Sequence, residues 1–242
     1  MHRTDKYLLN PQHRITVGLI GCGGTGSQVL NGLARINHAL VALGHPGLLV
    51  TVYDGDIVTD SNVGRQLYSI VDVGHNKAVL SVTRLNRYYS LDWMAIPEMY
   101  KKGSGMFNIM ITCVDSAKTR IEIGNYLSSI KRSSGPEQRA IYWMDFGNTA
   151  KCGQVILGGL KDKDRQQLPL VTEVFDFSKL SDKYSGPSCS LAAALNKQDL
   201  FINSTLAQFG LNILWRMFRE AKINHRGCFV NLDSLTVNAI SV

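Results

Sequence analysis

A glycine-rich turn near the start of the chain is the first place where the sequence could do chemistry. The letters GCGGTG occupy residues 21–26, between an apolar run and a run with helical spacing. Glycines let backbone N–H groups come close to a phosphate, and a helix that starts there adds the positive end of its dipole. We therefore predict nucleotide binding at Gly21, Gly23, Gly24 and Gly26. The turn alone leaves the ligand open among NAD, FAD, S-adenosylmethionine and ATP, and it can also serve only to pack a helix on a strand.

The loop after the second apolar run narrows the choice of ligand. Asp54 ends that run, in a position from which a carboxylate can reach a ribose. Arg65 offers a planar fork for phosphate, and Lys77 opens a predicted helix with a point charge for the same anion. An ATP site needs such cations because charge gathers on phosphate oxygens during transfer, whereas hydride transfer has little use for them. The same loop carries further hydrogen-bonding side chains, those of Asp56, Asn62 and Gln66.

A third set of polar residues follows a later apolar run. Asp115 stands at the end of that run and is followed by Ser116. Mg²⁺ is usually held by one or two carboxylates together with substrate phosphates, so Asp115 is the predicted Mg²⁺ ligand. Taken singly, these residues have plain structural interpretations: Arg65 and Lys77 as solvated cations, and the aspartates as strand ends or, for Asp115, as a helix cap. Their joint placement after strands, where open α/β sheets bind ligands, favours the binding interpretation.

The elements that must position these residues alternate between strands and helices. Buried apolar runs predict strands at residues 14–21, 47–54, near 92–100, 107–115, 140–148 and 152–160. Apolar residues at helical spacing predict helices at residues 26–43, 75–89, 116–130 and 191–221, and residues 225–241 predict a terminal hairpin. We expect an α/β fold with a Rossmann-like, doubly wound, mainly parallel sheet and an antiparallel extension.

This fold would form one domain of residues 1–242. Its nucleotide-binding half would cover residues 15–125, and its second half residues 140–242, including the terminal hairpin. Residues 161–190 are polar, rich in turn formers and weakly periodic, which predicts a long crossing loop over the surface.

Composition excludes several classes of protein. The formal net charge of +7 is spread through the chain without a run of five Lys or Arg, so no basic tail and no direct nucleic-acid partner are expected. The five cysteines include no C-x-x-C pair, which argues against a structural zinc site and a disulfide framework and favours a reducing compartment. The N-terminus lacks the apolar run of a signal peptide, and no segment approaches the length of a membrane span. We expect a cytoplasmic protein with no membrane partner.

Four motifs in order give these observations a family resemblance. GCGGTG, DGDIVTDSNVGRQ, VGHNKA and CVDSAKTR resemble the ThiF/MoeB family of ubiquitin-activating-enzyme-like adenylyltransferases in both order and spacing. The resemblance covers residues 15–125 firmly and the second half more loosely. The RGCFVNLD tail and the QDLFIN segment are similar to the ThiF-like proteins of bacterial PRTRC gene systems.

The resemblance implies a reaction and a role for each matched residue. The C-terminal carboxylate of a small ubiquitin-like or sulfur-carrier β-grasp protein would attack the α-phosphate of ATP, giving an acyl adenylate and pyrophosphate. Catalysis would rest on charge neutralisation and alignment, since a carboxylate nucleophile is already ionised. The implied roles are backbone contacts to ATP from Gly24 and its neighbours, ribose binding by Asp54, phosphate contacts by Asn62, Arg65 and Gln66, neutralisation of the α-phosphate by Lys77, and Mg²⁺ binding by Asp115. Ser116 stands where the family commonly has Asn.

Cys189 marks a further step that the resemblance implies. Family members that form a thioester or persulfide keep a cysteine on the crossing loop before the late helix, and Cys189 occupies that place. The product could then pass to a conjugating enzyme or a sulfur donor. The alternative is that Cys189 is buried or incidental. The remaining cysteines carry no such context.

The resemblance also implies a homodimer in which an N-terminal arginine reaches the partner's ATP. Arg3 and Arg14 are the only candidates, and Arg14, directly before the first strand, is better explained as structural. The zinc-binding C-x-x-C pairs of many relatives are missing. Two other functions stay open: a noncatalytic module that binds a nucleotide or a β-grasp protein, and an NAD-dependent oxidoreductase, which would leave Arg65 and Lys77 unexplained.

Overall fold

The protein is built on an eight-stranded sheet. The computed structural model describes residues 1–130, 139–160, 168–177, 192, 195 and 198–242. The strand order is β10-β9-β7-β6-β5-β2-β3-β4. The strands are β2 (Ile15–Ile20), β3 (Leu48–Tyr53), β4 (Met94–Ile96), β5 (Ile109–Thr112), β6 (Tyr142–Asn148), β7 (Cys152–Gly159), β9 (His225–Asn231) and β10 (Thr236–Ser241).

The sheet changes from parallel to antiparallel at β6. Strands β4, β3, β2, β5 and β6 pair in parallel, whereas β7, β9 and β10 are added antiparallel. The parallel strands β2, β3 and β5 are apolar and almost wholly buried because helices cover both faces of this part of the sheet. This arrangement confirms the predicted doubly wound sheet with an antiparallel extension.

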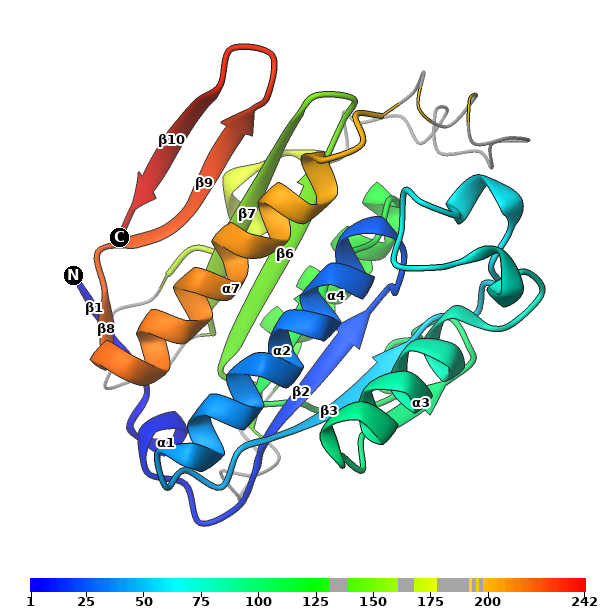
Figure 1. Ribbon diagram of the computed structural model, residues 1–242. Helices are drawn as coiled ribbons and strands as arrows, with labels where there is room; N and C mark the ends of the chain where they lie inside the picture. Colours follow the sequence, from blue (N-terminus) through cyan, green and yellow to red (C-terminus); the bar gives the residue numbers. More distant parts are fainter. Residues whose placement is uncertain (131–138, 161–167, 178–191, 193–194, 196–197) are drawn as a thin grey trace.

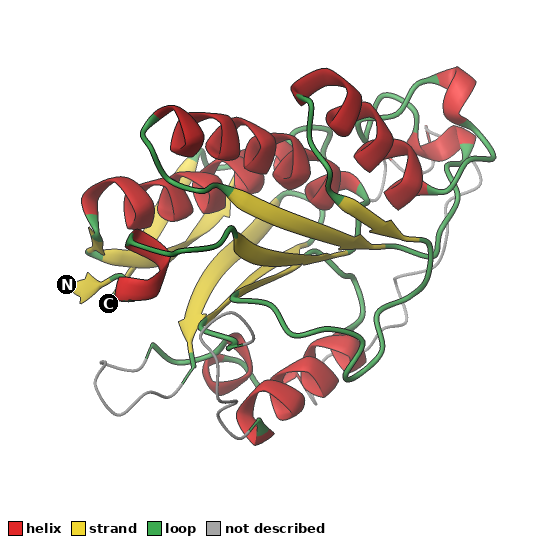
Figure 2. Cartoon of the chain, turned by 90° about the horizontal axis from the view of Figure 1, so that it is seen from below, coloured by secondary structure: helices red, strands yellow, loops and turns green. Residues whose placement is uncertain are grey.

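Two helical layers cover the sheet (Figures 1 and 2). One face carries α2 (Gly24–Ala42), α3 (Lys77–Tyr89) and α7 (Ile202–Glu220), and the other carries α4 (Ala117–Ser129) and the short α5 (Val171–Val174). Helices α2 and α7 lie side by side with very close approach, since a Cβ atom built on Gly32 would lie 2.1 Å from Cδ1 of Leu211. None of the described helices is both long and apolar enough to cross a bilayer.

The predicted late helix at residues 191–221 is interrupted: Ala192 and Leu195 are helical, but α7 begins only at Ile202, so the prediction of one continuous helix was wrong. Residues 198–201 are not helical. The backbone N–H of Asp199 donates to Ala150 O at 2.7 Å, in the β6–β7 turn, and the Asp199 carboxylate accepts from the backbone N–H of Phe201 at 2.8 Å. These bonds turn the chain before α7 starts. Asp side chains often bond to nearby backbone N–H groups in this way, and such bonds compete with helix formation. Most of the predicted crossing loop, including Cys189, lies outside the described residues.

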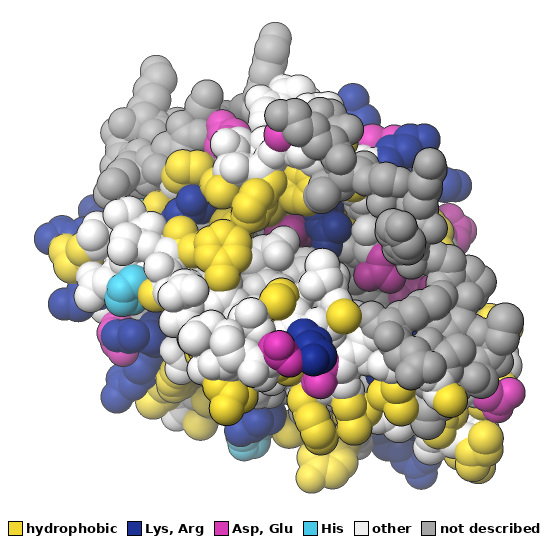
Figure 3. All heavy atoms as spheres, turned by 90° about the horizontal axis from the view of Figure 1, so that it is seen from above, with side chains coloured by type: hydrophobic (Ala, Val, Ile, Leu, Met, Phe, Trp, Pro, Cys, Tyr) yellow, Lys and Arg dark blue, Asp and Glu magenta, His cyan; other side chains and the backbone are white. Residues whose placement is uncertain are grey.

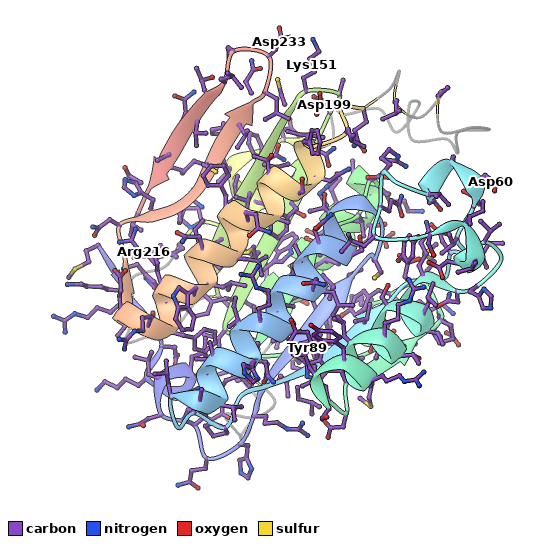
Figure 4. The ribbon with its side chains drawn as sticks, viewed as in Figure 1. Asp60, Tyr89, Lys151, Asp199, Arg216 and Asp233 are labelled. Atoms are coloured by element: carbon purple, nitrogen blue, oxygen red, sulfur yellow. The ribbon has the colours of Figure 1, made fainter. Side chains whose placement is uncertain are left out.

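The turns of the antiparallel extension anchor the start of α7. Lys151, in the β6–β7 turn, forms an ion pair with Asp233 in the β9–β10 turn at 2.5 Å, and Asp199 lies beside them (Figure 4). At the opposite end of α7, β1 (His2–Arg3) pairs with β8 (Lys222–Ile223). The N-terminal segment between them and the sheet forms α1 (Lys6–Leu9).

Candidate functional site

The predicted nucleotide turn connects β2 to α2 at the carboxyl edge of the parallel strands. Three of its four glycines are required by packing. Gly21 has φ +90°, and a Cβ atom there would lie 2.6 Å from Cys113 O. On Gly26 a Cβ would lie 1.9 Å from Gly21 O, and on Gly24 it would lie 2.5 Å from Asn203 Nδ2. The turn is therefore tight, and the structure explains these three glycines without any ligand.

Gly23 is different. A Cβ atom on it would meet nothing among the described residues closer than the Gln66 side-chain amide, at 3.9 Å. Gly23 is also the N-cap of α2 and supplies no side-chain cap, so the first N–H groups of this long helix receive no side-chain acceptor from it. An anion that approaches Gly23 would meet these N–H groups and the positive end of the helix dipole.

Asp54 braces the turn from the neighbouring strand. One carboxylate oxygen accepts from the backbone N–H of Cys22 at 2.5 Å, and the other accepts from the N–H of Asp56 at 2.9 Å. Burial raises the pKa of Asp54, although these two N–H groups and nearby Lys77 counteract it. The predicted ribose ligand is thus first of all a support for the glycine turn. A carboxylate has lone pairs to spare for a ribose hydroxyl.

The loop at residues 54–76 carries the polar side chains toward the turn. It includes the short 3₁₀ helices η1 (Asp60–Asn62) and η2 (Ile70–Asp72). Asn62, a predicted phosphate ligand, accepts from the Thr59 backbone N–H at 3.0 Å and so closes a capping box around η1. Tyr68 donates from its hydroxyl to Cys22 O at 2.6 Å, which ties the loop to the glycine turn.

Asp72 stabilises the same loop through contacts with Ser69 and with α3. Its carboxylate accepts from the backbone N–H and the hydroxyl of Ser69, at 2.7 and 2.9 Å, and forms an ion pair with Arg84 on α3. Burial alone would raise the pKa of Asp72, but the hydrogen bonds from Ser69 and Arg84 outweigh it and hold the pKa below its usual value. Asp72 is therefore charged in the folded protein, and its charge is part of what fixes the loop.

Two buried polar atoms beside the glycine turn have no partner. These are Nε of Arg65 and Oε1 of Gln66, in the part of the chain that the structure describes. Arg65 uses another nitrogen, Nη1, to donate to Gln198 Oε1 at 2.6 Å. Burial lowers the pKa of Arg65, and the negative charge of Asp115 acts in the opposite direction. Buried polar atoms without a partner are rare and call for a ligand or water.

Lys77 completes the positive side of the site. It is the first residue of α3, and only 9% of its side chain is exposed. Its ammonium group lies 3.1 Å from Oδ2 of Asp56, whose side chain is 54% exposed. The helix itself is capped by Asn76, which accepts from the Val79 N–H at 3.0 Å. An ammonium group has three donors, so Lys77 retains hydrogen-bonding capacity beyond Asp56.

Asp115 lies exposed after β5, at the start of α4. The alternative interpretation of Asp115 as a helix cap was wrong, because Ser116 is the N-cap and accepts from the Thr119 N–H at 3.2 Å. Beneath them, buried Arg120 donates to both carboxylate oxygens of Asp145, at 3.0 and 3.1 Å. The described residues contain no group of three or more His, Cys, Asp or Glu side chains arranged to hold a metal.

The surface above these residues is the carboxyl edge of the sheet, seen from above in Figure 3. Hydrophobic side chains and charged side chains of both signs are exposed on it. Most of the residues predicted from the sequence come together here: the glycine turn, Asp54, Asp56, Gln66, Arg65 and Lys77, with Asp115 close to Arg65. Cys189 falls outside the described residues.

The two N-terminal arginines do not reach this site within their own chain. Arg14 forms an ion pair with Asp92, which agrees with a structural role. Arg3 lies on β1, which pairs beside the C-terminal end of α7, whereas Asn203 at the other end of α7 touches the glycine turn. The 19 residues of α7 separate them by about 28 Å.

Three polar residues of the site were missed from the sequence. Thr25 donates to Asn203 Oδ1 at 2.8 Å, and Asn203 Nδ2 donates to Gln198 Oε1 at 2.9 Å. The sequence offers no clear signal for them, because Gln198 and Asn203 stand among other polar residues of the predicted late helix. Spacing alone could not show that these amides face a turn that is far away in the sequence.

Comparison with known proteins places this arrangement in a family. The ThiF family profile matches residues 9–133, more than half of the chain. Among solved structures, selenomethionine PaaA is 17% identical, with a TM-score of 0.62, over 96% of this chain and 64% of its own. E. coli MccB is 14% identical, with a TM-score of 0.64, over 97% and 63%, and a structure of MccB with ATP is 15% identical, with a TM-score of 0.60, over 97% and 64%.

These structures share the fold of the chain, and the chain spans somewhat less than two thirds of their length. No curated protein sequence matches it. The match to the family profile includes the glycine turn, the loop with Arg65 and Gln66, Lys77 and Asp115. The chain belongs to the ThiF family.

Proposed function

We propose that this protein binds ATP with Mg²⁺ and adenylates the C-terminal carboxylate of a small protein or peptide. The observation that carries the proposal is the pair of unpartnered buried atoms, Arg65 Nε and Gln66 Oε1, beside the open space at Gly23. A donor on a cation, an acceptor and helix N–H groups without a side-chain cap at one place suit a phosphate chain with its neighbouring ribose.

The residues present fit ATP. Gly23 and the first turn of α2 would hold phosphate oxygens, Arg65 and Lys77 would neutralise them, and Asp54 would meet the ribose. ATP, when bound, supplies an electrophilic α-phosphate and pyrophosphate as the leaving group. Asp115, exposed and close to Arg65, would hold Mg²⁺ against the phosphates, as hard cations are held in such sites.

The chain's own contribution would be alignment and charge. An ionised carboxylate needs no general base, so the barrier lies in bringing two anions together. Buried Lys77 and half-buried Arg65 offset that repulsion more strongly than fully exposed cations could. The position of Lys77 on the first turn of α3 fixes its charge relative to the glycine turn.

A small ubiquitin-like or sulfur-carrier β-grasp protein is the proposed substrate. Structures of the neighbour MccB with ATP and with MccA support a nucleotide and a separate substrate on this fold. Thioester formation on Cys189, transfer to a conjugating enzyme and a homodimer with Arg3 reaching the partner's site are further parts of the proposal. Cys189→Ala should leave ATP–pyrophosphate exchange intact and abolish any reducible protein adduct.

ATP–pyrophosphate exchange tests the proposal. Purified protein with Mg²⁺ is assayed with and without a candidate β-grasp protein that ends in glycine, and with that protein lacking its C-terminal glycine. We expect exchange that requires the intact C-terminus and is abolished in Asp115→Ala. Exchange that proceeds without any carboxylate substrate, or that persists in Asp115→Ala, would contradict the assignment.

A noncatalytic binding module is the second candidate, because neither N-terminal arginine reaches the site within one chain. Arg3 lies at the far end of α7 from the site of its own chain, so the arginine that the family supplies to ATP must come from another subunit or be missing. ATP binding without exchange, in the presence of the β-grasp protein, would support this candidate. An NAD-dependent oxidoreductase is less well supported, because it would leave Arg65 and Lys77 without a role.

A further inference from the structure

We propose that Gln198 is a positioning residue for Arg65. Its side-chain oxygen accepts from Arg65 Nη1 at 2.6 Å and from Asn203 Nδ2 at 2.9 Å. Asn203 in turn accepts from the Thr25 hydroxyl at 2.8 Å. This row of hydrogen bonds, the Thr25–Asn203–Gln198–Arg65 relay, joins the first turn of α2 to the guanidinium group, and the inference rests on the proposed ATP site.

The direction of each bond in the relay follows from chemistry. Arg65 has donors and no acceptor, so Gln198 must turn its oxygen toward it. Asn203 shares that oxygen and must donate from Nδ2, which leaves its own oxygen for Thr25. Every member therefore has one orientation, and an orientation fixed by partners on both sides resists rotation better than a single bond.

The relay is anchored to rigid elements at both ends. Thr25 and Asn203 are buried, at 7% and 4% exposure, in the first turns of α2 and α7. Gly24 makes room for Asn203, since a Cβ atom there would lie 2.5 Å from Nδ2. Gln198 is held by the next residue, Asp199, whose backbone N–H donates to Ala150 O.

Fixing one nitrogen of a planar guanidinium sets the direction of the others. With Nη1 on Gln198, Nε of Arg65 stays buried and unpartnered beside Gln66 and the glycine turn. Without Gln198, the half-buried Arg65 side chain could rotate so that Nε finds another hydrogen-bond partner. Its N–H groups would then no longer point toward the phosphates. The relay thus preorganises a ligand contact before the ligand arrives.

ATP affinity of folded variants tests the inference. The dissociation constant for ATP with Mg²⁺ is measured by titration calorimetry for the wild type, Gln198→Met, Arg65→Ala and the double variant. Met keeps the length of Gln198 without its acceptor, and Gln208→Met, at an exposed site on α7, is the matched control. Thermal melting of each variant verifies folding, and Gln198→Ala replaces Gln198→Met if the latter is misfolded.

If Gln198 positions Arg65, Gln198→Met raises the dissociation constant about tenfold, and Gln208→Met leaves it unchanged. In the Arg65→Ala background the same change adds less than about twofold, because its target is gone. Equal weakening in both backgrounds, or no effect of Gln198→Met where Arg65→Ala weakens binding, overturns the positioning role and spares the ATP site. Unchanged affinity in Arg65→Ala overturns both.

Discussion

Replacing Lys77 with Met separates a binding role from a structural one. The Lys77 side chain is 9% exposed, whereas its ion-pair partner Asp56 is 54% exposed. A pair with one solvated member contributes at most about 1 kcal/mol to folding, so Lys77→Met should change the free energy of unfolding by about 1 kcal/mol or less. Met fills the same narrow space without a charge, which limits any packing loss.

The effect on ATP should be much larger. A buried ammonium within about 4 Å of a phosphate oxygen, at an effective dielectric constant of about 20, gains about 4 kcal/mol. Asp56 already neutralises part of that charge in the free protein, at 3.1 Å. We therefore expect a net loss of about 2.7 kcal/mol, which corresponds to about a hundredfold weaker ATP binding.

Titration calorimetry with Mg²⁺ and ATP, beside urea unfolding of the same samples, gives both numbers. Lys118→Met is the control, since Lys118 is 81% exposed on α4 and lies 3.9 Å from Glu122. ATP affinity in Lys77→Met within about threefold of the wild type would refute the reasoning and assign Lys77 to Asp56 alone. A large loss of stability would show instead that Lys77 holds the loop.

Three further outcomes follow from the packing of the turn, the loop and the cysteines. Gly26→Ala should lower the free energy of unfolding by about 3 kcal/mol in urea titrations, because its Cβ would lie 1.9 Å from a carbonyl oxygen of the same turn; a change below about 1 kcal/mol would contradict the geometry. The pKa of Asp72 is lower in the folded protein, so its contribution is present above the unfolded value, near 4, and is lost as the pH falls through the folded value. Asp72→Asn, which also weakens the pair with Arg84, should therefore be less stable at pH 7. In urea unfolding between pH 2 and 7, its free energy of unfolding should fall less steeply toward low pH than that of the wild type. An equally steep fall in the variant would count against this account. Iodoacetamide at pH 8 should modify exposed Cys152 well before Cys22, because burial shields Cys22 and raises its pKa to about 11; peptide mapping that finds both modified at one rate would refute this.

Local pattern was enough to predict most of the sheet and its helices. Runs such as those of β2 and β3 are apolar at most positions because both of their faces are covered, and α2 follows directly from a glycine turn. The switch to antiparallel strands at β6 was also predictable, since two strands follow each other there without room for a helix.

The start of α7 could not be predicted from pattern, because a tertiary bond decided it. Residues 191–221 have helical spacing throughout, but the contact of Asp199 with Ala150 in a distant turn ends that continuity. The roles of the glycines had the same limit. All four suit a phosphate by type, yet three are explained by close contacts with Cys113, Asn203 and Gly21.

The site itself was predictable by residue type and less so by arrangement. Charge and hydrogen-bonding capacity singled out Arg65 and Lys77. In the structure, hydrogen bonds through Gln198 and Asn203 link Arg65 to Thr25 of the glycine turn. The charge of Lys77 acts on Asp54, whose carboxylate supports that turn. That Asn62 closes the capping box of η1, and that Ser116 rather than Asp115 caps α4, depends on backbone geometry that several sequences could adopt. Gln198 was missed because its partner Arg65 is distant in the sequence and the pair forms only after α7 packs on α2.

The packing of α7 on α2 sets an order for events during synthesis. Helix α2 ends at Ala42, and α7, which packs on it, begins at Ile202. At a synthesis rate of about 5–20 residues per second, the apolar face of α2 stays uncovered for roughly ten to thirty seconds. The outer edge of β7 waits for β9 in the same way. A ribosome that carries this chain therefore holds an exposed helix face and an open strand edge until residues 202–231 have emerged, and such apolar surface and open edges are what chaperones protect.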